Sequence, residues 1–313
     1  MPRTFASVPC ALLLLTLAAC SGDDLNGEPS GDAGAAAGDC GWPLEATLHD
    51  AGDDPQRILE LSPAAGDRIE LEMWTAVETE LLIDGEDSSF VDTPDIHLGM
   101  VVTVDEVNDD EIVMSFEYDD ARATTATHVA MTEAVESVAG LTGTLTTSRS
   151  GGFADVEIAD RAQLESGAGH EVPVVLGDLE WMLTDMPVLF PDEAVGIGGR
   201  WTTAYPTDGD VLPACIQTTY TLTALDDESY EVSVEWAEDV VPTTVERDGA
   251  MSAEVVGGST AGSITSSGTL GSPLPETSSI VVSHELEEEV ERDGAVETRE
   301  RTTVHERGFE RRR

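Results

Sequence analysis

The order of alternating segments limits the fold of this chain more than any other feature of its sequence. Four segments alternate β-branched, aromatic or other apolar residues with threonine, serine or acids: VVTVDEV (101–107), EIVMSFEY (111–118), TTYTLTAL (218–225) and SYEVSVEW (229–236). This period of two predicts strands with one buried and one solvent-exposed face. The acidic triplets between the paired segments supply turn residues. The sequence therefore predicts antiparallel hairpins.

The same features occur twice in the same order, which indicates an internal duplication. One copy begins at Gly66-Asp67-Arg68-Ile69 and ends at GTLTTS (143–148). The other begins at Gly199-Arg200-Trp201 and ends at GSITSS (262–267). We therefore expect two similar β units within residues 40–170 and 171–313, forming either one sheet or two domains.

A repeated phrase predicts two further hairpins. VERDGAM (245–251) and VERDGAV (290–296) each centre on Asp-Gly, which suits a tight two-residue turn. In the second hairpin this turn places Glu288 opposite Arg299, a favourable pair, and Glu287 opposite Glu300, an unfavourable one.

Two segments have the apolar spacing of amphipathic helices. In the first, 127–140, Met131, Ala134, Val135 and Val138 share a face, and Thr127 is placed to cap it. The second, 173–186, is expected to pack on the sheet or to cover an apolar groove as a lid. The side chains expected to cover a ligand there are Trp181, Met182, Met186 and Phe190.

The N-terminus has the order of a bacterial export signal. A short region containing Arg3 precedes an apolar stretch from Ala11 to Leu17, which is too short to span a bilayer. The following Leu17-Ala18-Ala19-Cys20 resembles the lipobox of bacterial lipoproteins, which implies removal of residues 1–19 and acylation of Cys20. The alternative is an ordinary cleaved signal. Residues 20–39, small and acidic, then predict a disordered tether.

The lipobox implies a membrane-anchored protein of the cell envelope. Ser21 after the cysteine resembles the class that is sorted to the outer membrane, on its periplasmic or surface side. The body, with LFPDEAVGIGGRW (189–201) after the second helix, resembles an uncharacterised lipoprotein family carrying a domain of unknown function. It is more distantly similar to the half-barrels of the LolA/LolB and LppX/LprG lipid-handling lipoproteins.

The charge of the chain excludes one large class of partners. Its formal net charge is −48, and all of its basic residues are arginines. Nucleic acids and anionic lipid surfaces both require a basic footprint, so we expect neither as a partner. Seven arginines lie between Arg292 and Arg313. They predict either a basic docking tail or, more simply, ion pairs with the acids of the protein itself.

After removal of the signal and acylation of Cys20, two cysteines remain. Cys40 and Cys215 form either a disulfide, in an oxidising compartment, or two separate buried thiols.

The known motifs of catalysis and metal binding are missing from the sequence. None of its six histidines has HExxH spacing, and there is no GxSxG segment. Acidic clusters at 50–54 and 105–111 do not match a calcium loop and favour solvated turns. We therefore expect no enzyme, no cofactor and no metal site.

Together these features predict a mainly β protein: antiparallel sheets from two duplicated units, half-barrel or sandwich-like, with one or two covering helices. Two functions follow. In the first, the sheet and the second helix enclose a lipid-like hydrophobic ligand. In the second, the protein has no small-molecule ligand and presents an acidic face to a protein partner.

Overall fold

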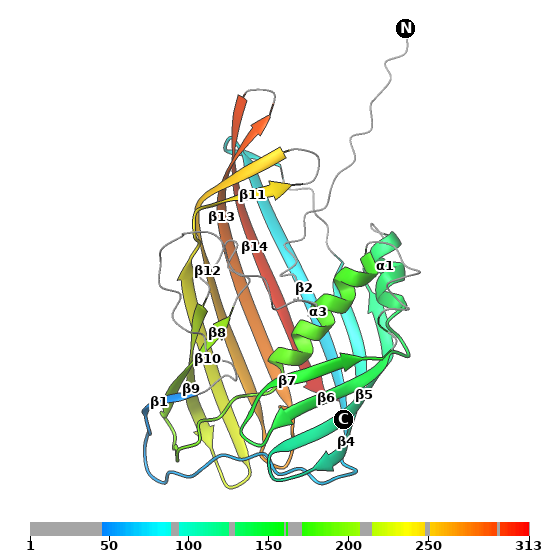
Figure 1. Ribbon diagram of the computed structural model, residues 1–313, viewed down its shortest axis with the longest axis vertical. Helices are drawn as coiled ribbons and strands as arrows, with labels where there is room; N and C mark the ends of the chain where they lie inside the picture. The colour runs from blue at the N-terminus through cyan, green and yellow to red at the C-terminus, as the bar shows by residue number, and fades with distance from the viewer. Residues whose placement is uncertain are drawn as a thin grey trace, which may run out of the picture.

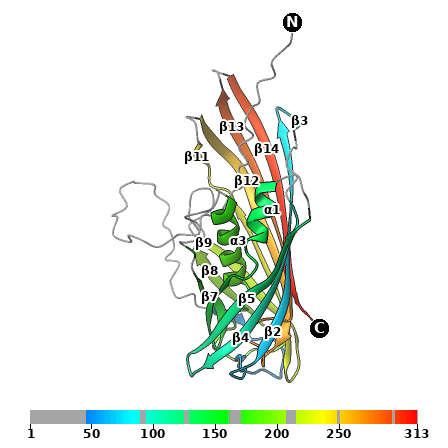
Figure 2. The ribbon, with the colours of Figure 1, turned by 90° about the vertical axis from the view of Figure 1, so that its right-hand side faces the viewer.

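The computed structural model describes residues 46–88, 94–124, 129–159, 161, 171–206, 215–247, 251–292 and 295–312. These residues form one long antiparallel sheet of fourteen strands and two helices (Figure 1). The sheet curves, and both helices lie on its concave side (Figure 2). This arrangement is the half-barrel form of the expected fold, and both β units belong to the same sheet.

Each unit contributes five strands that follow one another in the sheet. The first unit contains β2 (Arg68–Ile83), β4 (Ile96–Val107), β5 (Glu111–Ala123), β6 (Thr142–Ser148) and β7 (Gly151–Ile158). The second contains β8 (Arg200–Pro206), β9 (Cys215–Leu225), β10 (Ser229–Asp239), β12 (Met251–Thr269) and β13 (Thr277–Arg292). Strand β14 (Ala295–Arg311) lies between the units and pairs with β13 on one side and β2 on the other.

Three short strands complete the sheet. At one edge, β1 (Thr47–Asp50) pairs with β8. The other two, β3 (Glu86–Asp87) and β11 (Thr243–Arg247), pair with β2 and β12.

The hydrogen bonds at the start of each unit follow the same pattern. The amide of Gly66 donates to the carbonyl oxygen of Val104 at 2.8 Å, and the Val104 amide donates to Asp67 at 2.9 Å. In the second unit, the Gly198 amide donates to Leu222 at 2.8 Å, and the Leu222 amide donates to Gly199 at 2.9 Å. Gly66 and Gly198 both have positive φ, at 93° and 83°, which glycine adopts without steric cost.

The acidic turns are also built alike. The side-chain oxygen Oδ1 of Asn108 accepts the amides of Asp110 and Glu111 at 3.0 and 2.8 Å. Oδ1 of Asp226 accepts the amides of Glu228 and Ser229 at 3.0 and 2.7 Å. These side chains replace a backbone turn acceptor, which explains why Asn and Asp occupy equivalent positions.

The repeated phrase forms one of the two turns as expected. Arg292 pairs with Ala295, so two residues connect β13 and β14, and the expected pairs Glu288–Arg299 and Glu287–Glu300 are confirmed. At the other site, Arg247 pairs with Met251. Three residues therefore separate the paired positions, and the expected two-residue turn is wrong there.

The core lies between the lower part of the sheet and the helices, α1 (Val129–Glu136) and α3 (Glu171–Asp185). The expected apolar face of the first helix is confirmed for Met131, Ala134 and Val135, which are buried on α1. Val138 is also buried, but it lies beyond Glu136, where the helix ends earlier than expected. Thr127 lies outside the described residues. Trp201 is fully buried and stacks on Tyr220 with ring centroids 5.5 Å apart. No helix in the described ranges is long and apolar enough to cross a membrane.

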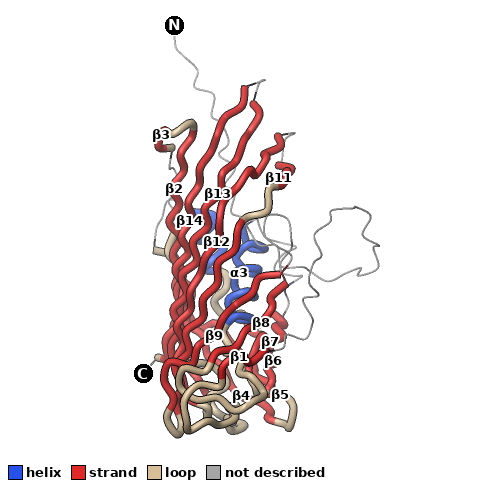
Figure 3. The backbone as a smooth tube through the Cα atoms, turned by 90° about the vertical axis from the view of Figure 1, so that its left-hand side faces the viewer, coloured by secondary structure: helices blue, strands red, loops and turns tan. Residues whose placement is uncertain are grey.

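The longest strands extend beyond the helices. In Figure 3, β13, β14 and β2 continue upward past α3, whereas β4 and β5 lie in the lower part of the molecule. The inner face of the sheet therefore has a lower region covered by α3 and an upper region that α3 does not reach.

Candidate binding site on the inner face of the sheet

The expected ligand-covering segment is largely part of the core. Met186 and Phe190 are buried, and the ring of Phe190 makes an edge contact with Tyr230 at a centroid distance of 5.0 Å. Met182 is half-buried against the same core. The side chain of Trp181 lies outside the described residues. Phe190 thus packs as a core residue and covers no open space.

A small cavity remains where α3 meets the sheet. It is lined by Met73, Met182, Met186, Ile280, Arg307, Gly308 and Phe309, and its volume is about 10 Å³. A cavity of this size holds roughly one water molecule. A ligand can enter here only if methionine side chains move, which their flexible thioether chains allow.

Above this cavity the inner face changes from apolar to charged. The burial of β13 alternates strictly between Glu285 and Glu291, so the side of the sheet on which each residue lies is unambiguous. Register with β13 and β2 places Arg299, Arg301 and Arg307 of β14 on the inner side, together with His305. We call these three arginines the inner arginine row.

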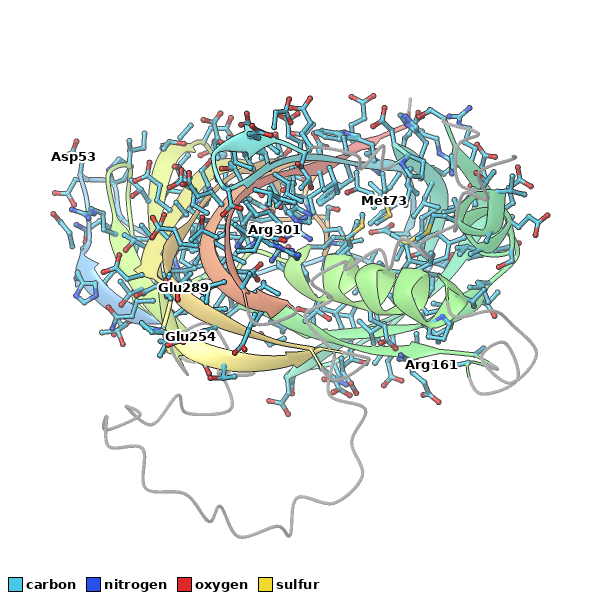
Figure 4. The ribbon with its side chains drawn as sticks, turned by 90° about the horizontal axis from the view of Figure 1, so that it is seen from above. Asp53, Met73, Arg161, Glu254, Glu289 and Arg301 are labelled. Carbon is cyan, nitrogen blue, oxygen red and sulfur yellow. The ribbon has the colours of Figure 1, made fainter. Side chains whose placement is uncertain are left out.

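The outer face of the same strands is acidic. It carries Glu70, Glu72, Glu78 and Glu80 of β2, Glu285, Glu287, Glu289 and Glu291 of β13, and Glu300, Glu306 and Glu310 of β14. Figure 4 shows Arg301 and Met73 within the curve of the sheet, with Glu254 and Glu289 on its outer side. Because β14 alternates arginine with glutamate, the sheet separates the two charges.

Two glutamates accompany the arginine row on the inner side. The Arg301 guanidinium lies 3.5 Å from Glu288, and their side chains are 13% and 4% exposed. Arg299 Nε donates to Glu297 at 2.7 Å. Ion pairs this far from water are screened less than surface pairs. Between residues 297 and 309, the inner side of β14 therefore carries three arginines and one glutamate, Glu297. Glu288 of the neighbouring β13 adds a second glutamate.

A pair of histidines lies beside the arginines. The rings of His284 and His305 meet edge to face with centroids 5.6 Å apart, and His284 Nδ1 shares a hydrogen bond of 2.9 Å with the Thr260 hydroxyl. Burial, and then His284 and Arg307, lower the pKa of His305 to about 4. Burial, and then Arg307 and Arg301, also lower the pKa of His284. Both rings are therefore neutral near pH 7 and act as hydrogen-bonding groups.

Most other expected sites receive no test from the structure. Cys20 and Cys40 lie outside the described residues, as does the side chain of Cys215 at the start of β9. The acylation and the disulfide stay predictions. In the ranges that the structure describes, no three histidine, cysteine or acidic side chains group as metal ligands.

The C-terminal arginines mostly pair with acids, as the simpler interpretation expected. Besides Arg299 and Arg301, Arg311 lies 3.5 Å from Glu276, and Arg312 lies 2.8 Å from Asp119. Sequence reasoning did not single out Arg299, Arg301, Arg307 or His305 as a group. The signal was present, because all four have odd numbers in a strand whose acids at 300, 306 and 310 have even ones.

Searches against protein-family models and against curated proteins found no match for this chain. The resemblance of its body to lipoprotein families stays a prediction.

Proposed function

We propose that this chain is a non-enzymatic lipoprotein of the bacterial envelope, anchored through Cys20, that binds a lipid-like ligand along the inner face of its sheet. The observation that supports the ligand is the junction between the methionine-lined cavity and the inner arginine row. There, apolar and charged side chains border one another on a concave surface. Binding sites for amphiphiles combine an apolar wall with a few placed polar groups in this way.

The half-buried residues above the cavity extend this surface. On β2, Val77, Thr79, Leu81 and Ile83 are each partly accessible on the inner side. Their apolar area gives an acyl chain a place to lie without unpacking the lower core. Each buried methylene group contributes about 0.8 kcal/mol.

The test is native mass spectrometry with lipid extraction on the full acylated chain purified from its own envelope. A reproducible bound lipid of one class supports the proposal. A clean apo mass, with no uptake of added lipid, contradicts it. The mass of the mature N-terminus in the same experiment tests the anchor, since Cys20→Ala must abolish the acyl modification.

A second function is favoured by the acidic outer face. The glutamates of β2, β13 and β14 lie side by side there, and such a field attracts a basic protein partner at low salt. This function requires no small-molecule ligand. It predicts a complex that weakens as salt rises, which crosslinking in the envelope at two salt concentrations would detect.

A further inference from the structure

We propose that the inner arginine row selects an amphiphile with an anionic headgroup, through Arg307 at the edge of the methionine-lined cavity and Arg301 above it. This inference rests on the proposed lipid-binding function and specifies its ligand class. Phosphate and carboxylate headgroups share the required chemistry, because a guanidinium binds both through two parallel hydrogen bonds.

The first argument is the position of Arg307. It is 8% exposed, and it lines the same cavity as Met73, Met182 and Met186. An acyl chain that displaced these methionine side chains would hold its headgroup beside the guanidinium. The apolar and cationic parts of the surface therefore meet in the order that an amphiphile requires.

The second argument is the direction of the row. Arg299, Arg301 and Arg307 lie on one strand and one face, and the distance from the first to the last is about 27 Å at the usual rise per residue. The row leads away from the covered core into the region that α3 does not reach. A headgroup can thus follow the arginines outward while its chain remains on apolar residues.

The third argument is charge. The whole chain has a formal net charge of −48, and the glutamates of these strands other than Glu288 and Glu297 lie on the opposite side of the sheet. A free phosphate ion meets the repulsion of this acidic exterior and gains no apolar contact. An amphiphile gains apolar burial in addition to the arginine contacts, so the balance favours the lipid over the free ion.

The neutral histidines add hydrogen-bonding capacity without competing for the anion. His284 and His305 lie beside Arg301 and Arg307, and their lowered pKa values keep them uncharged near pH 7. A neutral imidazole offers one N–H donor, which can contact a headgroup oxygen.

The experiment uses the full acylated chain in non-ionic detergent micelles that contain equal amounts of phosphatidylglycerol and phosphatidylcholine. Native mass spectrometry measures the ratio of the two bound lipids. We expect the wild-type protein to enrich phosphatidylglycerol about tenfold, which is the effect of one charged hydrogen-bonding contact. Arg307→Gln should bring the ratio close to one, and Arg307→Lys should retain most of the preference.

Two further variants control for folding and for charge. Glu288→Gln with Arg301→Gln removes the inner ion pair without leaving a buried charge, and it should reduce the preference severalfold. Arg122→Gln removes an arginine of the outer face, which lies 3.0 Å from Glu72, and it should leave the ratio unchanged. Circular dichroism identifies any variant that has not folded.

The outcomes separate the two proposals. Equal binding of both lipids, in wild-type and variant proteins alike, overturns the selection of an anionic headgroup and leaves lipid binding intact. No bound lipid of either kind overturns the proposed function itself. If added inorganic phosphate displaces phosphatidylglycerol at millimolar concentration, the site takes the free ion, and the amphiphile inference fails.

Discussion

Strand β2 has one inner face but two kinds of environment along it. In its lower half, Ile69, Leu71 and Met73 are at most 2% exposed, whereas Val77, Thr79, Leu81 and Ile83 above them are only half-buried. The neighbouring β14 changes at the same level, from buried Phe309 and Arg307 to half-buried His305 and Arg301. Where α3 covers the sheet, the inner-face residues must pack against the helix. Above α3, the inner face is only half-buried, so charged residues can occupy it.

The largest expected effect comes from comparing two matched leucine-to-alanine substitutions on β2. Leu71→Ala, at a fully buried position, should lower the free energy of unfolding by about 3–5 kcal/mol, because it leaves a cavity that the core cannot fill. Leu81→Ala, on the same strand and face, should cost about 1 kcal/mol, since the position is already partly exposed. Urea denaturation measures both. Equal effects would remove the distinction between the two regions.

Acid should destabilise the upper region through His305. The pKa of His305 in the folded chain is lowered to about 4, below its ordinary value of 6.5. The unfolded chain therefore binds a proton first as pH falls, and stability is lost between pH 6.5 and about 4. The loss reaches about 3 kcal/mol.

The titratable and charged groups that act on His305 are His284 on β13 and Arg307 on β14. His305→Asn should flatten the dependence of stability on pH over this range. Comparing the variant with the wild type at each pH cancels the contribution of the many surface carboxylates. Identical slopes for the two proteins would show that the ring is not held neutral.

The lower region also contains the two equivalent acidic turns. Asn108→Ala removes a side-chain acceptor from two backbone amides and should cost about 1 kcal/mol. Asp226→Ala removes the same acceptor in the second unit and should destabilise the protein in the same direction.

Only the second turn should respond to pH. Hydrogen bonds from Ser229 lower the pKa of Asp226, so its contribution is present at neutral pH and is lost as pH falls through that lowered value. Thermal unfolding of both variants at neutral and acidic pH makes the comparison. The destabilisation caused by Asp226→Ala should shrink at acidic pH, whereas that caused by Asn108→Ala should not change, and an equal pH dependence of the two would contradict this prediction.

The smallest effect is expected on the outer side of the upper region. Glu287 and Glu300 face each other across β13 and β14. Glu300→Arg should replace this repulsion with attraction and raise stability by about 0.5 kcal/mol at low salt. Glu300→Gln, which only removes the repulsion, should give roughly half of that gain. Both gains should fade in concentrated salt, and a salt-independent gain would mean that charge is not its source.

Period-two alternation and turn residues were enough to predict the strands of each unit and the register of the last hairpin. Local chemistry fixes these features, as the paired turns at Asn108 and Asp226 illustrate. The position of β14 between the units was not predicted, because it depends on pairing with β2, where Ile83 lies opposite Arg299, 216 residues later in the sequence. No local pattern encodes such a contact.

The candidate site was predicted only in part. Met182 of α3 and Met186 directly after it were identified from their helical spacing, but the arginines opposite them were interpreted as surface residues. Arg307 is inside because the register with β2 sets it opposite Thr75, on the same side as Met73. The alternation in β14 predicts that its arginines lie on one face of the sheet. Only the pairing with β2 shows which face of the sheet lies toward the helix.

The central place of β14 also has a consequence for biogenesis. It is the last of the described strands to be synthesised, yet both units need it to become one sheet. Until it is synthesised, β13 and β2 each present an open edge of unpaired backbone groups, which invites pairing with other chains. A chaperone that shields strand edges would therefore matter most in the interval before this strand docks.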